Sequence, residues 1–333
     1  MNATLVLTRS EVADLLALDE CIEAVERAFR AHAEGLTLPT GVLGTHVTGG
    51  GFHVKTAGIN LPAPRFVTKV NANFPDNRVR FGLPTIQGVV LLFEALDGRP
   101  LAVMDSIEIT IVRTGAATAV AAKHLARADS KTVTVCGCGN QGRVSLRALT
   151  RVLDLDRAYV WDLDYAAAER LATDLSGELA IEISPVRNFA DAVGRSDVCV
   201  TCTPSRRGFL QKSHVRPGTF IAAVGADSED KQELEPALVA SSKVVVDIME
   251  QCAAIGELHH ALAQRLMVTH DVHAELGDVI AGKRPGRTSP EDVIVFDSTG
   301  TALQDVAAAV MVYDRAISSG RGTMLDLGAS ASS

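Results

Sequence analysis

The chain of 333 residues carries 40 acidic and 32 basic side chains, and 47 % of its residues are hydrophobic. This length and apolar content are enough for a large buried core and predict two domains. The formal net charge of −8 argues against a nucleic-acid or anionic-membrane partner. Residues 1–10 lack a basic stretch followed by an apolar core, and no apolar run approaches the roughly 20 residues of a membrane span, so we expect a cytoplasmic protein.

The first part of the chain has the pattern of a mixed α and β domain. Leu5–Leu7 is predicted to be a strand, the capping box Thr8-x-x-Glu11 begins a helix, and a second helix is expected from about Asp19 to His32. Short strands separated by Gly and Pro follow. A long alanine-rich helix, Ile107–Ala126, closes this part, and its small side chains would let a neighbouring backbone approach closely.

A glycine motif in the middle of the chain predicts dinucleotide binding. Thr132–Cys136 is predicted to be a strand, and Gly137, Gly139 and Gly142 then form G-x-G-x-x-G before a predicted helix, Arg143–Leu153. The first glycine makes a tight turn, the second lets the backbone approach a pyrophosphate, and the third allows helix and strand to pack closely. The N–H groups at the start of the helix are suited to bind the phosphates.

An acidic residue after the next predicted strand, Arg157–Trp161, indicates which dinucleotide is bound. Asp162 follows Gly142 by 20 positions, since 162 − 142 = 20. A carboxylate there accepts hydrogen bonds from the ribose hydroxyls of NAD and would repel the 2′-phosphate of NADP. No basic residue follows before Arg170, so NAD is the predicted cofactor.

From residue 129 to about 300, predicted strands alternate with helices, which indicates a mainly parallel, doubly wound sheet. We expect the strands at 132–136, 157–162, 180–183, 197–202, 219–224, 243–247, 266–269 and 293–296. A last helix, Thr301–Ser318, should return to the first domain, and the tail 328–333 should be disordered. The predicted fold is α/β, with a Rossmann-type domain of residues 129–300 and an α+β domain of residues 1–128 and 301–333.

Two cysteines with C-x-x-C spacing, Cys199 and Cys202, have the spacing of half a metal site. They lie in a predicted buried strand, where residues three apart point to opposite faces and do not easily converge on one metal. No second Cys or His pair with zinc-finger spacing accompanies them. We therefore expect no metal site and interpret both as small buried hydrophobic residues.

Polar residues at the carboxyl ends of predicted strands are candidates for chemistry, because the crevice of a parallel sheet opens there. They fall in Thr203–Ser205, Val224–Asp227 and Phe296–Gly300. Asp227 follows a strand exit and is placed to face a nicotinamide. Its position fits equally well a loop aspartate that caps residues 228–235.

Two cations of the first domain lie among apolar or small residues. Lys69 is in the strand Phe66–Asn71, where it is either an edge-strand charge or a buried site for a carboxylate. Arg113 is a cation among the small residues of the alanine-rich helix and suggests a buried anionic partner. Two such cations beside a nicotinamide favour a substrate that bears a carboxylate.

Several longer strings resemble the ornithine cyclodeaminase/mu-crystallin family. They are LAVMDSIEITIVRTGAA at 101–117, GADSEDKQEL at 225–234 and FDSTGTALQD at 296–305. The string VHAELGDVIAG at 272–282 resembles in particular the archaeal-type alanine dehydrogenase branch of that family. The resemblance extends from Leu5 to about Ser318.

The resemblance implies a homodimer whose first domain, completed by the C-terminal helix, binds substrate and forms the dimer. It implies that Lys69 and Arg113 hold the substrate carboxylate, that Thr299 borders the substrate, and that Asp227 is the acid/base. Lys69 and Asp227 are then the candidate catalytic residues. Beyond the three glycines, the resemblance assigns to NAD the residues Thr85, Asn140, Gln141, Asp162, Thr203, Val224, Gly225, Ala226, Lys231 and Ser298.

The chain departs from the family pattern between residues 41 and 55. Gly41 stands where the family usually has a basic residue, and a further family arginine falls at or near His53. Lys55 shares the strand face of His53 and could supply the missing charge, although it could also be a surface lysine. We expect a pocket of different shape here, which affects the amino acid that is accepted.

Together these features predict an NAD-dependent amino-acid oxidoreductase. It would deaminate a small L-amino acid as an alanine dehydrogenase does, or reduce the corresponding imine. The alternatives are an ornithine or lysine cyclodeaminase that recycles bound NAD, a reductase of pyrroline or piperideine carboxylate, and a crystallin-like binding protein without turnover. The presence of Lys69, Arg113 and Asp227 together argues against the last alternative.

Overall fold

The computed structural model describes residues 3–60 and 63–327. The chain divides into two compact units, residues 1–113 with 301–333, and residues 114–300. The division falls inside one continuous helix, α4 (Ser106–Leu125), so the second unit begins at residue 114 and not at the predicted 129. The tail expected to be disordered, 328–333, lies outside the described residues.

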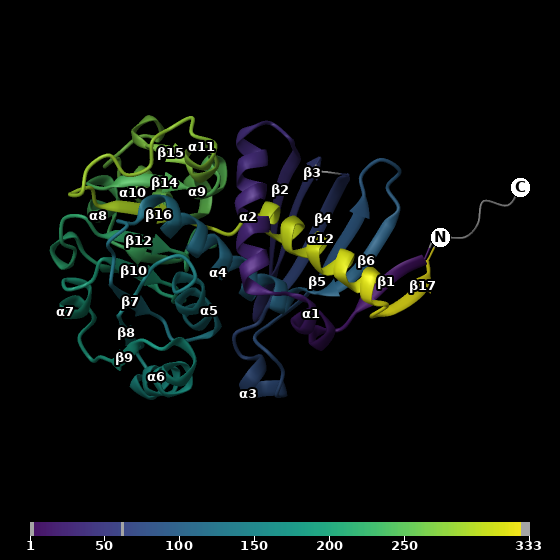
Figure 1. Cartoon of the computed structure of the whole chain (residues 1–333), viewed down its shortest axis with the longest axis horizontal. Helices are drawn as coiled ribbons and strands as arrows, with labels where there is room; N and C mark the ends of the chain where they lie inside the picture. Colours follow the sequence, from purple (N-terminus) through teal and green to yellow (C-terminus); the bar gives the residue numbers. More distant parts are fainter. Residues whose placement is uncertain (1–2, 61–62, 328–333) are drawn as a thin grey trace, which may run out of the picture. The chain divides into compact units, whose positions relative to one another are not determined.

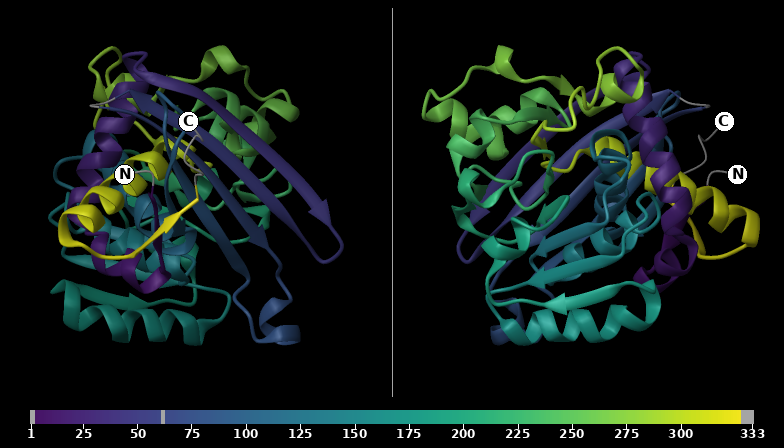
Figure 2. Two further views of the ribbon diagram at one scale, coloured as in Figure 1. Left: turned by 90° about the vertical axis from the view of Figure 1, so that its right-hand side faces the viewer. Right: turned by 60° about the vertical axis from the view of Figure 1, so that its left-hand side comes forward.

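The described strands of the first unit form a seven-stranded sheet in the order β17-β1-β6-β5-β4-β3-β2 (Figure 1). The five strands from β2 to β6 form an antiparallel meander, and β1 pairs in parallel with β6. Figure 2 shows the long hairpin of β2 and β3 in purple and blue. The strands are β1 (Ala3–Leu7), β2 (Thr37–Val47), β3 (Gly50–Asn60), β4 (Pro64–Asn73), β5 (Ile86–Glu94), β6 (Pro100–Asp105) and β17 (Thr323–Asp326).

The helices of this unit are α1 (Arg9–Leu15), α2 (Leu18–Ala33), α3 (Asn77–Phe81), the first part of α4, and α12 (Ala302–Ser319). The predicted capping box forms, because the Thr8 side chain accepts from the Glu11 N–H while the Glu11 carboxylate accepts from the Thr8 N–H. Helix α12 packs against α2, β3 and β4 (Figure 1). The predicted return of the last helix to the first domain is therefore confirmed.

The second unit contains an eight-stranded parallel sheet in the order β15-β14-β16-β12-β10-β7-β8-β9. Five of its strands, β9-β8-β7-β10-β12, follow the 3-2-1-4-5 part of the strand order of doubly wound dinucleotide-binding sheets, and β16 lies between β12 and β14. Strands β8 and β9 are added on one side of β7, and the next strands, β10 and β12, on the other side. The crevice between β7 and β10, where the strand order switches, is the expected ligand site. The strands are β7 (Thr132–Cys136), β8 (Arg157–Trp161), β9 (Glu182–Pro185), β10 (Val198–Thr201), β12 (Phe220–Ala223), β14 (Lys243–Val246), β15 (Ala274–Glu275) and β16 (Ile294–Asp297).

Helices and a small second sheet surround these strands. Helix α5 packs against β7 and β10, and α6 packs against β8 and β9. Two further strands, β11 (Arg206–Leu210) and β13 (Gln232–Leu234), pair in parallel. The helices are α5 (Asn140–Leu149), α6 (Tyr165–Leu179), α7 (Phe189–Val193), α8 (Pro236–Ala240), α9 (Met249–Ile255), α10 (Glu257–Ala263) and α11 (Leu276–Ile280). No helix in the described part of the chain has the length and apolar character needed to cross a membrane.

Two local predictions for this unit need correction. Residues 266–269 do not form a strand, because Leu266 and Val268 are 49 % and 60 % exposed and Thr269 begins a 3₁₀ turn. The helix after the glycine motif runs from Asn140 to Leu149, so it begins inside the motif and ends earlier than predicted. The other predicted strands of the sheet agree with the structure to within two residues.

Candidate active and cofactor-binding sites

The glycine loop follows β7 at the point where the strand order reverses. Gly137 has a φ of +108°, and a Cβ there would lie 2.9 Å from the backbone oxygen of Cys202. A Cβ on Gly142 would lie 1.9 Å from the Gly137 oxygen, whereas one on Gly139 would meet open space. The backbone therefore requires glycine at the first and third positions, and the second leaves room for a ligand to approach. Gly139 is also the N-cap of α5, whose first two residues are Asn140 and Gln141.

Asp162 lies directly after β8 and is tied to this loop. Its Oδ2 accepts a 2.8 Å hydrogen bond from the Cys138 N–H, and its Oδ1 accepts a 3.0 Å bond from the Asp164 N–H. These bonds fix the carboxylate at the carboxyl end of β8. A carboxylate in that position is the group that binds ribose hydroxyls in dinucleotide sites.

The loop after β12 contains Val224, Gly225 and Ala226, followed by Asp227 and Lys231. The Asp227 side chain is 55 % exposed, and its Oδ1 lies 2.6 Å from the Lys231 Nζ. The structure therefore pairs the predicted acid/base with a residue that was predicted to contact NAD. The catalytic role of Asp227 and the cofactor role of Lys231 both remain predictions.

Buried carboxylates, none of which was predicted as a site residue, hold the loops at the carboxyl end of the parallel sheet. Asp247 accepts hydrogen bonds from the Ser298 hydroxyl at 3.1 Å, the Thr299 hydroxyl at 3.3 Å and the Gly300 N–H at 2.9 Å. It thereby holds the loop after β16, where Ser298 and Thr299 were predicted to contact NAD and substrate. Glu233, Glu257 and Asp297 are also buried, and burial raises the pKa values of Glu233 and Asp297 to about 7.

In the first unit, Lys69 and Arg113 are buried around one carboxylate. The Lys69 Nζ lies 2.7 Å from the Asp305 Oδ2, and the Arg113 Nε lies 3.2 Å from its Oδ1. The Arg113 guanidinium also donates a 2.6 Å hydrogen bond to the Gln304 Oε1. Asp305 and Gln304 were not predicted as site residues from the sequence, although an acidic residue within an apolar helix is an unusual feature.

Lys55 joins this cluster, because it stands opposite Lys69 in the ladder between β3 and β4. It is 8 % exposed, so the alternative of a surface lysine is wrong. Lys69 is 3 % exposed on β4, which lies between β3 and β5, so it is not an edge-strand charge. His53 shares the face of Lys55 and stands opposite Asn71, while Gly41 on β2 pairs with Thr56.

The cluster contains more positive than negative side chains. Burial lowers the pKa of Lys69 to about 7; the charge of Asp305 opposes this shift, and the charges of Arg113 and Lys55 add to it. Burial alone would raise the pKa of Asp305, but the attraction of Lys69 and Arg113 outweighs it and the pKa falls below its ordinary value. Lys69 and Arg113 both contact the Asp305 carboxylate, and Lys55 adds a third positive charge near it, which is a charge arrangement suited to a carboxylate ligand.

Thr85 and the two cysteines of the C-x-x-C spacing are not part of the Lys69–Arg113 cluster. Thr85 is exposed just before β5 in the first unit, where its backbone oxygen accepts from the Phe74 N–H, whereas the other predicted NAD residues belong to the second unit. Cys199 is buried in β10, and the Cys202 thiol donates to the Gly137 oxygen at 3.2 Å. Within the described residues, no group of three or more His, Cys, Asp or Glu side chains is arranged to hold a metal ion.

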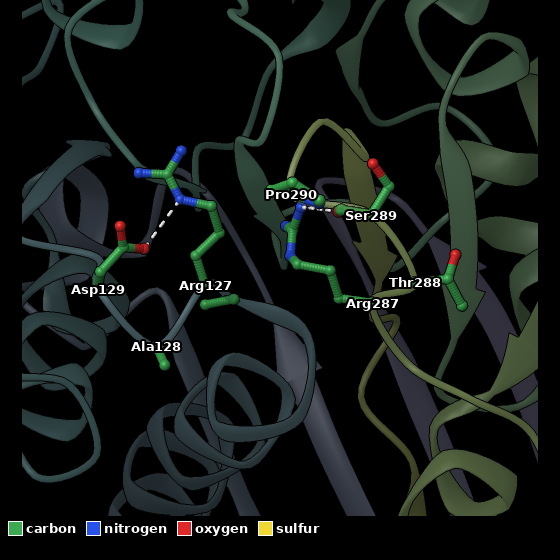
Figure 3. Close-up of a pocket in the computed structure, with 8 residues that line it drawn as sticks. Arg127, Ala128, Asp129, Arg287, Thr288, Ser289 and Pro290 are labelled. Carbon is green, nitrogen blue, oxygen red and sulfur yellow. Dashed lines mark hydrogen bonds and ion pairs between the residues drawn. The ribbon is translucent and has the colours of Figure 1, made fainter.

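A pocket of about 410 Å³ lies at the amino-terminal ends of the strands of the eight-stranded sheet, opposite the carboxyl ends that carry the glycine loop (Figure 3). Its lining comes from residues 126–129, which precede β7, and from residues 287–290, which precede β16. The Arg127 Nε donates a hydrogen bond of 3.1 Å to the Asp129 Oδ1. A dashed line marks this bond in Figure 3. This pocket is separate from the glycine loop and contains none of the predicted site residues.

The sequence profile of the ornithine cyclodeaminase/mu-crystallin family matches residues 2–320, and the chain belongs to this family. An alanine dehydrogenase from Archaeoglobus fulgidus is 38 % identical over 324 residues, which cover 97 % of this chain and 98 % of the relative. The family inferred from the sequence strings is thereby confirmed, as is its link to the archaeal alanine dehydrogenases.

Two solved structures extend this relationship to bound ligands. An archaeal alanine dehydrogenase dimer with bound NAD has a TM-score of 0.93 at 37 % identity and covers 98 % of this chain and 100 % of its own. The Δ¹-pyrroline-2-carboxylate reductase of Thermococcus litoralis, in complex with NADH and L-proline, has a TM-score of 0.90 at 32 % identity and covers 96 % and 99 %. These relatives are nicotinamide-dependent enzymes, and the predicted α/β fold class is confirmed by the same matches.

Proposed function

We propose that this protein is an NAD-dependent oxidoreductase that acts on a small L-amino acid or on the corresponding imine. The observation that carries the proposal is the buried cluster of Lys69, Arg113 and Lys55 around Asp305, whose excess positive charge suits a carboxylate. The glycine loop and Asp162 in the second unit fit NAD. The relatives that bind NAD and act on amino or imino acids support both assignments.

In this proposal, Thr299 contacts the substrate, while Lys69, Arg113 and Lys55 hold its carboxylate. This contact orients the Cα–H bond and supplies most of the proximity effect. The glycine loop, the start of α5 and Asp162 would hold NAD, which would supply the hydride acceptor for Cα. Asp227 takes a proton from the substrate ammonium group or activates the water that hydrolyses the resulting imine. In deamination, the amino acid, NAD⁺ and water become a 2-oxo acid, ammonium, NADH and a proton.

The second unit supplies most of the proposed cofactor contacts. The glycine loop and the start of α5 would bind the pyrophosphate, and Asp162 would bind the adenosine ribose. The remaining proposed NAD residues are Thr85, Thr203, Val224, Gly225, Ala226, Lys231 and Ser298.

Two alternatives share this site. A cyclodeaminase for ornithine or lysine would release ammonia without net formation of NADH, because the hydride returns to the substrate. A reductase of pyrroline or piperideine carboxylate would favour the reverse direction, and the relative that binds NADH and L-proline keeps this alternative open. A crystallin-like binding protein would need no acid/base, so the presence of Asp227 counts against it.

A screen of L-amino acids with NAD and NADP tests the proposal, with reduced nicotinamide and ammonia recorded together. We expect NADH and ammonia in equal amounts from a small L-amino acid. Ammonia without NADH from a diamino acid would establish the cyclodeaminase instead. Binding of NAD with no turnover of any amino or imino acid would contradict the proposal.

We further propose a cytoplasmic homodimer. The archaeal relative is a dimer, and exposed apolar side chains on β2 and β3 of this chain support a second copy as the partner of this sheet. These side chains include Val42, Leu43, Val47 and Phe52. Light scattering after size-exclusion chromatography should give twice the mass of the chain. A mass of one chain at micromolar concentration would contradict the dimer.

A further inference from the structure

A buried glutamate, Glu233 on β13, connects the loops that follow β10 and β12. Its Oε1 accepts hydrogen bonds from the Thr203 N–H at 2.5 Å and from the Thr203 hydroxyl at 2.7 Å. Its Oε2 accepts from the Gly225 N–H at 3.0 Å. Each carboxylate oxygen therefore holds a different loop, and Glu233 has no exposed surface.

The surroundings of Glu233 are shaped for a carboxylate. A Cβ on Gly225 would lie 2.4 Å from the Glu233 Oε2 and 2.6 Å from the Thr203 oxygen, so residue 225 must be glycine for these groups to meet. Each loop presents one backbone N–H donor to Glu233, from Thr203 and from Gly225, and each donor requires its own acceptor. A carboxylate provides two acceptors, whereas an amide of the same shape provides one acceptor and one donor.

Glu233 is itself held by a second buried carboxylate. The Glu257 Oε1 accepts from the Glu233 N–H at 2.7 Å, and the Glu257 Oε2 accepts from the Leu234 N–H at 3.0 Å. The backbone N–H groups of Glu257 and Leu258 donate in turn to Asp297 at the end of β16. The hydrogen bonds thus run from β16 to the loops after β10 and β12.

We propose that Glu233 is a positioning residue that sets the spacing of the Thr203 and Gly225 loops for cofactor binding. The inference rests on the proposed function, which assigns Thr203 and Gly225 to NAD. Glu233 acts through these two residues. A buried acid is costly where an apolar side chain could pack, so its presence is explained by the two N–H donors that it satisfies.

The test compares Glu233→Gln with the wild type, with Glu229→Gln as the matched control. Glu229 is an exposed acid in the loop that leads to β13. In Glu233→Gln the amide NH₂ must face the N–H donor of one of the two loops. That loop then loses its hydrogen bond to residue 233. We expect the Kd of NADH, titrated by nicotinamide fluorescence, to rise about tenfold or more, the size expected for one lost charge-assisted hydrogen bond. The KM for NAD should rise with it, while kcat at saturating NAD stays within about threefold.

A purely structural role would lower the melting temperature and the active fraction without changing the Kd of the folded protein. A Kd within twofold of wild type in Glu233→Gln, or the same rise in Glu229→Gln, would therefore overturn the inference. Failure of the wild type itself to bind NADH refutes the proposed cofactor, which is a different and distinguishable result.

If Glu233→Gln does not fold, amide hydrogen exchange of the wild-type protein provides the test. The Thr203 and Gly225 N–H groups should then exchange as slowly as those of β10 and β12, because both donate to a buried carboxylate. Exchange of both at the rate of exposed loop amides would overturn the inference.

Discussion

Lys69 and Asp305 form a buried ion pair in which the Lys69 Nζ lies 2.7 Å from the Asp305 Oδ2. The two residues are 236 positions apart in the chain, since 305 − 69 = 236, and they lie on β4 and α12. The last helix therefore supplies the carboxylate around which the cations of the first unit gather. The same pair links the stability of this unit to its proposed binding of a carboxylate.

Removal of the Asp305 charge should destabilise the protein strongly. Asp305→Asn leaves Lys69 and Arg113 buried without their counter-charge, and breaking such a buried pair costs about 3–5 kcal/mol. Chemical unfolding monitored by circular dichroism measures this loss. Asp154→Asn is the control, because its ion pair with Lys131 is largely exposed, and no measurable change is expected. Equal effects of the two substitutions would contradict the account.

The binding of a carboxylate should weaken as the pH rises through about 7. Burial lowers the pKa of Lys69 to about 7, so the amine is charged below that pH and neutral above it. The charged amine attracts the anion, and by linkage the bound anion raises the pKa of Lys69. Titration of the product 2-oxo acid against the NADH-bound protein, below and above pH 7, measures the trend.

The control for this trend is Lys69→Met, which removes the titrating amine while Arg113 keeps its charge. This variant should bind the 2-oxo acid more weakly and with a flatter dependence on pH. An unchanged slope in Lys69→Met would show that another group titrates.

Loss of the proposed acid/base should lower the rate of turnover strongly without weakening the binding of NADH. Asp227→Ala is expected to lower kcat by roughly 10²–10⁴, the usual contribution of general acid/base catalysis. The Kd of NADH should stay near the wild-type value. Asp230→Ala, an exposed acid of the same loop, serves as the control and should keep its activity. Turnover of Asp227→Ala near that of the wild type would remove Asp227 from the mechanism.

Asp162 should determine the choice between NAD and NADP. The wild type is expected to bind NADH more tightly than NADPH, because the carboxylate repels a 2′-phosphate. In Asp162→Ser the preference should fall by about tenfold or more, which corresponds to at least 1.4 kcal/mol. The ratio of the two Kd values is the measurement to use, since Asp162 also accepts from the Cys138 N–H and its loss weakens both. Equal binding of both cofactors by the wild type would contradict this role.

The parts of the site that could be predicted are local in sequence. Gly137, Gly142 and Asp162 act within one strand–helix–strand segment, so their spacing alone carries the signal. Lys69 and Arg113 stood out because each is a charge among apolar or small residues. Asp305 is an acidic residue within an apolar helix, which marks it as unusual, but its partners Lys69 and Arg113 are brought near it only by tertiary structure. Glu233 could not be predicted, because its role depends entirely on such distant partners. The wrong strand at 266–269 has a similar cause, since short apolar runs do not reveal whether they are buried.

In the proposed function, the cations around Asp305 bind the carboxylate of the substrate. The most direct test compares kcat/KM for the best L-amino acid of the screen with kcat/KM for its primary amide, which has the same carbon skeleton and no negative charge. We expect the amide to be poorer by about 10²-fold or more, because a buried cation loses its anionic partner. Comparable kcat/KM values for the acid and the amide would contradict the account.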